Sequence, residues 1–211
     1  QTCDLGITYG GISGGTVEAM ARSVHVLVDA SWEVGHSVSG VVLMVAGGAA
    51  AWISRKQAIQ GLSSVDVETY AASAAAADLL HQRGLLQELG VPMQSPTTIW
   101  CDNAGTVNIA NDAGSVGRSR HLAMRARFLQ DFKAAGEGKI CYVKTEDNAA
   151  DALTKPLERG RFSKHRSYLL GMVDVEQITR ERELHVGADV HAKEQEVPRD
   201  GELDAGTEEQ D

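Results

Sequence analysis

The sequence predicts an α/β fold in which one mixed sheet, a three-stranded antiparallel meander plus two further strands, is flanked by helices. Three observations lead to this prediction. Apolar, Val-rich runs with strand character follow one another between residues 23 and 56. A long segment whose small and apolar residues recur at helical spacing comes next, and two later strand-like segments alternate with helical ones. The chain has 211 residues, 43% of them hydrophobic, which is enough to bury the core of such a domain.

The first three strands are expected to pair as neighbours. Residues 23–30, SVHVLVDA, alternate between apolar and other side chains, as a half-buried strand does. Residues 37–48 and 49–56 continue as two more strands, and their junction contains Gly47 and Gly48, which favour a hairpin turn. Three consecutive strands joined in this way predict an antiparallel meander.

A helix is predicted over residues 66–89, with Ser63 or Ser64 as its N-cap. Glu68 lies on the inward face of this helix, where an unpaired carboxylate is costly to bury. The alternative is an ordinary acid in the first turn that interacts favourably with the helix dipole. The inward face is defined by small and apolar residues at helical spacing: Ala71, Ala74, Ala75 and Leu79.

The second half of the chain continues with alternating strands and helices. Capping residues, glycines and Pro156 mark the ends of these elements. The expected elements are a strand at 97–101, a short helix at 103–111, a basic helix at 121–135, a strand at 139–144, a helix that opens after Asn148 with Asp151 in its third position, and a last helix closed by Gly171.

Four acidic residues stand at strand ends or in the first turns of helices: Asp29, Glu68, Asp102 and Asp151. Such positions cluster along one edge of an α/β sheet, so the four side chains are expected to converge. A cluster without a Lys or Arg of its own needs cations, and oxygen ligands select hard divalent ions such as Mg²⁺ or Mn²⁺. Two such ions about 3.5–4 Å apart are suited to phosphodiester hydrolysis. For each acid taken alone, a turn or capping role is the alternative.

Seven short motifs occur in series along the chain: VDASW (28–32), SG within HSVSGVVL, WISRKQ (52–57), LSSVDVETYA (62–71), IWCDN (99–103), RSRHL (118–122) and DNAADALTKPL (147–157). In this order they resemble the ribonuclease H domain of the Pol polyproteins of copia-class LTR retrotransposons, over roughly residues 20–172. The segment ITYG (7–10) is similar to the stretch that leads into this domain from the polymerase.

This resemblance implies a ribonuclease H-like fold and endonucleolytic cleavage of the RNA strand of RNA:DNA hybrids. It assigns the family's metal-binding acids to Asp29, Glu68, Asp102 and Asp151, with two Mg²⁺ ions that Mn²⁺ can replace. The expected partners are the hybrid and the reverse transcriptase portion of the same polyprotein. The residues expected to bind the substrate are Asn103, Arg118, Arg120, His121 and Lys155.

The charge distribution indicates how the chain is organised. Residues 173–211 hold 13 acidic and 4 basic residues and so carry the whole net charge of −9; they are expected to form a mostly disordered tail. Residues 21–172 are expected to form the ribonuclease H-like domain, and residues 1–20 the connection from an upstream reverse transcriptase portion. Between residues 118 and 166 there are 12 basic and 6 acidic residues, which could follow a phosphate backbone or form a solvated helix face.

Other features limit the class of protein. Neither a secretory leader nor an apolar run of membrane-spanning length is present, so an intracellular site is expected: the cytoplasm, the nucleus or a virus-like particle. Cys3, Cys101 and Cys141 are scattered and odd in number, which suggests neither a disulfide framework nor a zinc site. Trp52 and Trp100 are expected in the core rather than as stacking platforms for bases.

Departures from the family pattern leave two functional hypotheses open. Ser31 stands where the family often has a second Asp, and His, Asp and His are commonly found where this chain has Gly117, Ala123 and Arg127. The first hypothesis is an active nuclease, favoured by the four acids. The alternative is a decayed or repurposed retrotransposon fragment that keeps the fold and hybrid binding without catalysis. An integrase or transposase is disfavoured, because those enzymes place their Glu last.

Overall fold

A five-stranded sheet forms the centre of the computed structural model, which describes residues 4–10, 16–33, 36–58, 61–112 and 120–172. The strand order is β3-β2-β1-β4-β5. β2 pairs antiparallel with β1 and β3, whereas β4 is parallel to β1 and β5. The predicted mixed sheet is therefore confirmed. The strands are β1 (His25–Glu33), β2 (His36–Val45), β3 (Gly48–Lys56), β4 (Thr97–Cys101) and β5 (Gly138–Tyr142).

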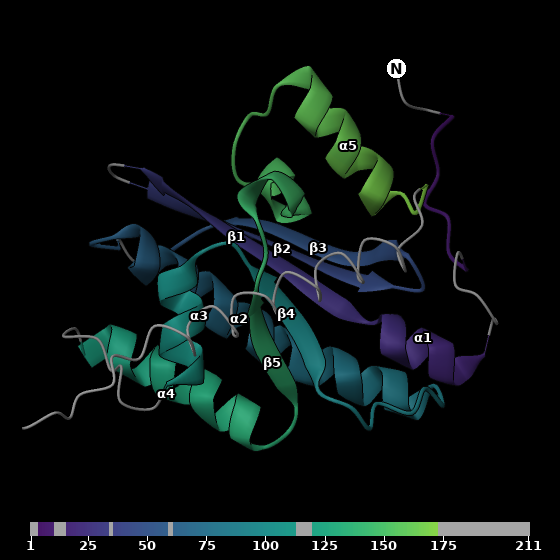
Figure 1. Cartoon of the computed structure of the whole chain (residues 1–211), viewed down its shortest axis with the longest axis horizontal. Coiled ribbons are helices and arrows are strands. Elements are labelled where there is room, and N and C mark those ends of the chain that lie inside the picture. The colour runs from purple at the N-terminus through teal and green to yellow at the C-terminus, as the bar shows by residue number, and fades with distance from the viewer. Residues whose placement is uncertain (1–3, 11–15, 34–35, 59–60, 113–119, 173–211) are drawn as a thin grey trace, which may run out of the picture.

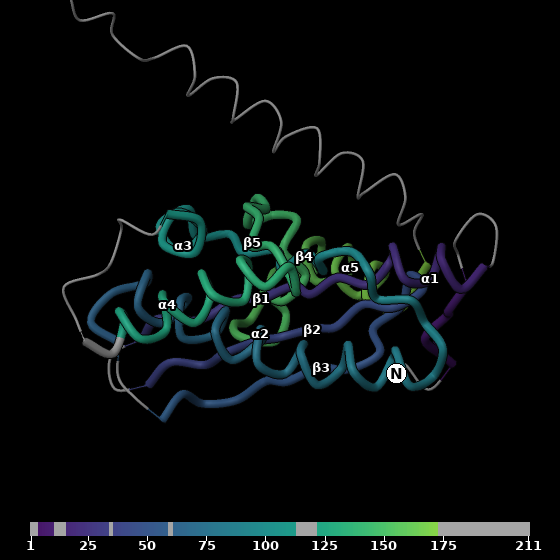
Figure 2. Tube along the Cα trace, turned by 90° about the horizontal axis from the view of Figure 1, so that it is seen from below, coloured from purple at the N-terminus to yellow at the C-terminus, as the bar shows by residue number. Residues whose placement is uncertain are grey.

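The helices lie close to their predicted positions, with one addition (Figure 1). The sequence did not predict α1, which is capped by Thr16 through a hydrogen bond from the Ala19 N–H. Figure 2 shows α1 at one end of the molecule and α3 with the start of α4 at the other. The helices are α1 (Val17–Ser23), α2 (Ser64–Glu88), α3 (Ala104–Asn111), α4 (Arg120–Ala134) and α5 (Arg159–Leu169), with two 3₁₀ helices, η1 (Thr145–Asp147) and η2 (Ala149–Leu153).

The two faces of the sheet bury two separate apolar clusters. On one face, Val26 and Val28 of β1 pack with α2 and α4. On the other face, Leu27 packs with η2 and with Tyr168 of α5. Consecutive side chains of a strand point to opposite faces, so the alternation in β1 serves both clusters. Asp29 therefore shares the η2 face with Leu27.

The turn between β2 and β3 is a tight hairpin. Ala46 and Gly47 both have positive φ, 49° and 88°, as the central residues of a type I′ turn require. Gly48 pairs with Val45 and begins β3. The predicted hairpin is confirmed, although its turn centres on Ala46 and Gly47 rather than on the two glycines.

The helix expected after Asn148 is a 3₁₀ turn, η2. Asn148 caps it as predicted, since its side chain accepts a hydrogen bond from the Ala150 N–H, and Asp151 is its third residue. Pro156 lacks the N–H that a longer α-helix would need there, and short runs commonly adopt 3₁₀ geometry. The last helix ends before Gly171, whose φ is 70°.

The two tryptophans differ in their environments. Trp100 is 3% exposed and belongs to the core, as predicted. Trp52 is 59% exposed, so its predicted core position is wrong. The reason is that β3 is an edge strand in which only the first two residues are buried. Cys101 is a buried thiol outside any disulfide, and none of the described helices combines the length and apolar character that a membrane crossing requires.

Candidate active site

Asp29 is held in the middle of β1, opposite Gly40 of β2. The carboxylate is 1% exposed and accepts a hydrogen bond from the Thr154 hydroxyl. A Cβ at Gly40 would lie 2.9 Å from the Ala150 carbonyl oxygen and 2.8 Å from the Thr154 methyl group. Gly40 thus leaves the space that brings η2 and the following residues against the sheet beside Asp29.

Asn148 attaches η2 to β1 next to Asp29. Its side-chain amide donates to the Val28 carbonyl oxygen at 2.9 Å, and its Oδ1 accepts from the Ala150 N–H at 3.3 Å. Asn148 and Asp151 are both fully buried. The same amide that caps η2 therefore also fixes Asp151 relative to β1, a role that the sequence analysis did not predict.

Glu68 and Asp102 come from the neighbouring elements. Glu68, on the inward face of α2 as predicted, is 5% exposed and accepts a hydrogen bond from the Ala30 N–H at 3.1 Å. Asp102 follows directly after β4 and is partly exposed. The N-cap of α3 is Asn103, which accepts from the Thr106 N–H at 3.0 Å. Asp102 is thereby free of the capping role that was its alternative.

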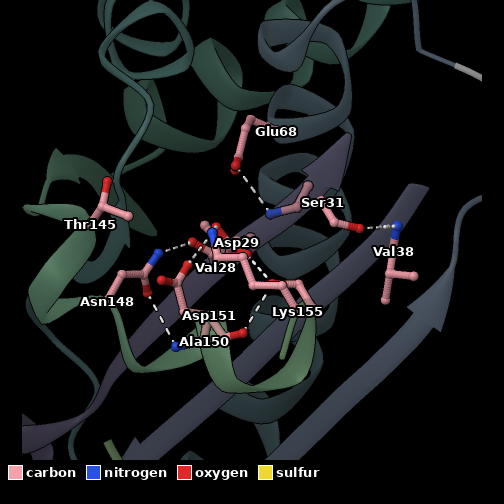
Figure 3. Close-up of polar contacts among 12 residues, drawn as sticks. Val28, Asp29, Ser31, Val38, Glu68, Thr145, Asn148, Ala150, Asp151 and Lys155 are labelled. Carbon is pink, nitrogen blue, oxygen red and sulfur yellow. Dashed lines mark hydrogen bonds and ion pairs between the residues drawn. The ribbon is translucent and has the colours of Figure 1, made fainter. Parts of the chain in front are cut away.

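The four acids form one connected cluster. Figure 3 labels three of them, Asp29, Glu68 and Asp151. Ligand atoms of Asp29, Asp102 and Asp151 all lie within 4.8 Å of one another. A second group that meets the same limit joins Glu68 to Asp102 and Cys101. The Cys101 thiol donates a weak hydrogen bond to Glu68 Oε2 at 3.8 Å. Asp102 belongs to both groups and links Glu68 to the other acids.

Burial makes this cluster electrostatically unfavourable. Burial, followed by the charges of Asp29 and Asp102, raises the pKa of Glu68 to about 9. Burial also raises the pKa of Asp29 to about 7, against the opposing effects of Thr154 and Lys155. Closely spaced carboxylates with raised pKa values fit a hard divalent cation, since added positive charge would favour their ionised forms. The donor set of the Asp29, Asp102 and Asp151 group consists of oxygen alone.

Two cationic side chains already contact this cluster, so the expectation that it has no Lys or Arg of its own is wrong. Lys155 Nζ lies 2.7 Å from Asp151 Oδ1 and 3.8 Å from Asp29 Oδ1. Arg161 Nη2 contacts Asp151 Oδ2. Lys155 is four residues after Asp151, and Arg161 reaches the site from the following helix. The acids raise the pKa of Lys155, which burial alone would lower.

The other residues predicted to bind substrate are only partly within the described structure. Asn103 caps α3 beside Asp102. Arg118 lies outside the described residues. Arg120 and His121 are the first two residues of α4, and their side chains lie outside the described part of the structure.

Comparison with known proteins identifies similar sequences, although no family model matches the chain. This chain is 29% identical over 157 residues to the retrovirus-related Pol polyprotein from transposon RE2 of Arabidopsis thaliana, and the match covers 72% of this chain and 11% of that protein. The match to the Pol polyprotein from transposon RE1 of the same plant is 29% identical and covers 66% of this chain and 10% of that protein. The match to the Pol polyprotein from transposon TNT 1-94 of Nicotiana tabacum is 27% identical and covers 60% of this chain and 9% of that protein. The chain thus spans about a tenth of the length of these relatives.

Among solved structures, RNase H1 from the halophilic archaeon Halobacterium salinarum aligns with a TM-score of 0.49 and 17% identity, covering 62% of this chain and 93% of that one. The N-terminal RNase H domain of a Mycobacterium tuberculosis protein, solved as a fusion with maltose binding protein, aligns with a TM-score of 0.48 and 13% identity, covering 68% and 96%. Over most of its length this chain is therefore similar in sequence to a segment of retrotransposon Pol polyproteins, as its motifs indicated, and its sheet has the strand order and pairing of a ribonuclease H-like fold.

Proposed function

We propose that this domain cuts the RNA strand of RNA:DNA hybrids during retrotransposon reverse transcription. The observation that carries the proposal is the convergence of carboxylates from β1, β4 and η2, with Glu68 of α2 beside them. Two Mg²⁺ ions, or Mn²⁺ in their place, would be held by Asp29, Glu68, Asp102 and Asp151. When bound, such ions activate a water molecule and stabilise the charge that develops on the phosphate.

The other residues of the site position the acids, and the exposure of Asp102 gives a substrate access to them. The Thr154 hydroxyl donates to the Asp29 carboxylate, and the Asn148 side chain fixes η2, which carries Asp151, against β1. Asp102 is the one partly exposed member of the four acids, and so it faces the side from which a substrate phosphate can approach. In the proposed reaction water attacks the phosphorus, the bond from phosphorus to the 3′ oxygen breaks, and 3′-hydroxyl and 5′-phosphate ends result.

The residues that we propose to bind the hybrid are basic or polar, namely Asn103, Arg118, Arg120, His121 and Lys155. Such contacts to phosphates give affinity without reading sequence. We place the nuclease in residues 21–172, inside the cell, with residues 1–20 leading from a reverse transcriptase portion of the same polyprotein. The Thr8 N–H donates to the Leu170 carbonyl oxygen and the Gly10 N–H to the Ala46 carbonyl oxygen, so residues 8–10 lie against the domain.

A second candidate function is a repurposed fragment that binds hybrids without cutting them. One observation favours it: both carboxylate oxygens of Asp151 are already engaged by cationic side chains. If those contacts persist in every state, Asp151 cannot serve as a metal ligand. The fold and the basic residues would then be retained for binding alone.

Cleavage of a labelled RNA:DNA hybrid tests the proposal directly. The wild-type protein is expected to cut the hybrid in Mg²⁺ and not in a chelator, and to leave duplex RNA of the same sequence intact. Asp66→Asn is a matched control, because Asp66 is an acid in the same helix turn as Glu68. The Asp66 carboxylate accepts a hydrogen bond from the Leu62 N–H and lies outside the acid cluster. Hybrid binding without Mg²⁺-dependent cleavage would favour the repurposed fragment.

A further inference from the structure

Lys155 pairs with two of the four acids of the cluster, Asp29 and Asp151. Its ammonium contacts one oxygen of Asp151, at 2.7 Å, and one oxygen of Asp29, at 3.8 Å (Figure 3). Asp29 and Asp151 are also two of the three residues whose ligand atoms lie within 4.8 Å of one another. A side-chain cation and a divalent ion would therefore use the same carboxylates.

Arg161 and Lys155 differ in how firmly they are held. Arg161 Nη2 donates to the Thr145 carbonyl oxygen as well as to Asp151, so it ties η1 to the site. The Lys155 side chain is 36% exposed, and both of its ion pairs are with the acids that a metal would bind. A long, flexible side chain open to solvent can leave the site without breaking a backbone contact.

We propose that Lys155 is a built-in counter-cation of the nuclease site, which neutralises Asp29 and Asp151 in the metal-free protein and is displaced when divalent metal binds. Arg161 stays on Asp151 and positions it. This inference rests on the proposed function, because it takes Asp29 and Asp151 as metal ligands. Two cations that compete for the same ligands lower each other's affinity by the same factor.

Magnesium binding measured by titration calorimetry tests the competition without any cleavage assay. Lys155→Met is expected to bind Mg²⁺ about tenfold more tightly than the wild type, within the usual range of coupling between two binding events. Lys164→Met is the matched control, because Lys164 pairs with Asp147 and the Glu146 carbonyl outside the cluster. Its Mg²⁺ affinity is expected to equal that of the wild type.

A second measurement uses the unmodified protein and so does not depend on the folding of a variant. Acetylation of lysine amines, followed by mass spectrometry, is expected to modify Lys155 faster in Mg²⁺ than in a chelator, with little change at Lys164. Equal Mg²⁺ affinity in Lys155→Met and wild type, or Lys155 labelling that Mg²⁺ does not change, would overturn the inference and leave the proposed function standing. If none of the proteins binds Mg²⁺, both are wrong.

Discussion

Replacing Asn148 with Ala tests whether one buried amide holds the site together. The substitution removes the hydrogen bonds from Asn148 Nδ2 to Val28 O and from the Ala150 N–H to Asn148 Oδ1. Both backbone partners would be left unsatisfied in a buried position, and each such group costs about 1–3 kcal/mol. We therefore expect the free energy of unfolding to fall by about 2–6 kcal/mol, which a domain in the upper part of the typical range of about 5–15 kcal/mol can survive.

The matched control is Asn111→Ala. Asn111 also donates its side-chain amide to a strand carbonyl, that of Ile140 at 3.1 Å, but the residue is exposed and water can replace the bond. Its loss is expected to cost less than about 1 kcal/mol. Urea denaturation of both variants, with hybrid cleavage measured on the folded proteins, gives the comparison. Equal destabilisation by the two substitutions would refute the assignment of Asn148 as the residue that fixes η2.

Three further predictions follow from the site and the charges. Asp102→Asn is expected to leave the fold intact, because Asn103 rather than Asp102 caps α3, and to slow cleavage at least about a hundredfold, as measured by hybrid cleavage with circular dichroism alongside. The metal-free protein is expected to lose stability as pH rises from about 4 to 9. The Glu68 pKa is near 4.5 in the unfolded chain and about 9 in the folded protein, so the folded state binds this proton more tightly. The melting temperature of Glu68→Gln should therefore fall less than that of the wild type over this range. Deleting residues 173–211, which carry a net charge of −9, is expected to strengthen hybrid binding at low salt, and equal affinities of the two forms would contradict that role for charge.

Local rules were sufficient to predict most of the elements and some of their caps. Ser63, one of the two predicted caps of α2, accepts a hydrogen bond from the Asp66 N–H, and such a cap can be predicted because it joins residues only three positions apart. The position of Asp102 after β4 could be predicted for the same reason. Helix α1 was missed because its seven residues contain one buried side chain, Ala19, and so show no apolar period.

Contacts between distant segments could not be read from the sequence. Arg83 of α2 is only 5% exposed. Its guanidinium donates to the Glu137 carboxylate, to the Thr97 hydroxyl and to the carbonyl oxygens of Met93 and Ser95, and these groups lie beside α2 only in the folded chain. Arg161 reaches Asp151 across the turn at Pro156, so its spacing in the sequence carries no helical signal. The four-residue spacing of Asp151 and Lys155 was visible, but an ion pair with one residue does not reveal the contact with Asp29.

The cost of the buried acids favours a nuclease over a fragment retained for its fold. Asp29 and Glu68 are buried with pKa values raised to about 7 and about 9, so both destabilise the folded protein whenever they are ionised. Apolar residues at these positions would pack the core without that cost. Gly40 is a second cost to stability, because glycine inside a strand is less favourable than a residue with a side chain. Its missing Cβ leaves the space beside Asp29 that residues 150–154 occupy. Residues that destabilise the folded protein and cluster in one place, as Asp29, Glu68 and Gly40 do, are typical of functional sites. A fragment needed for binding alone has no physical use for a buried carboxylate such as Glu68.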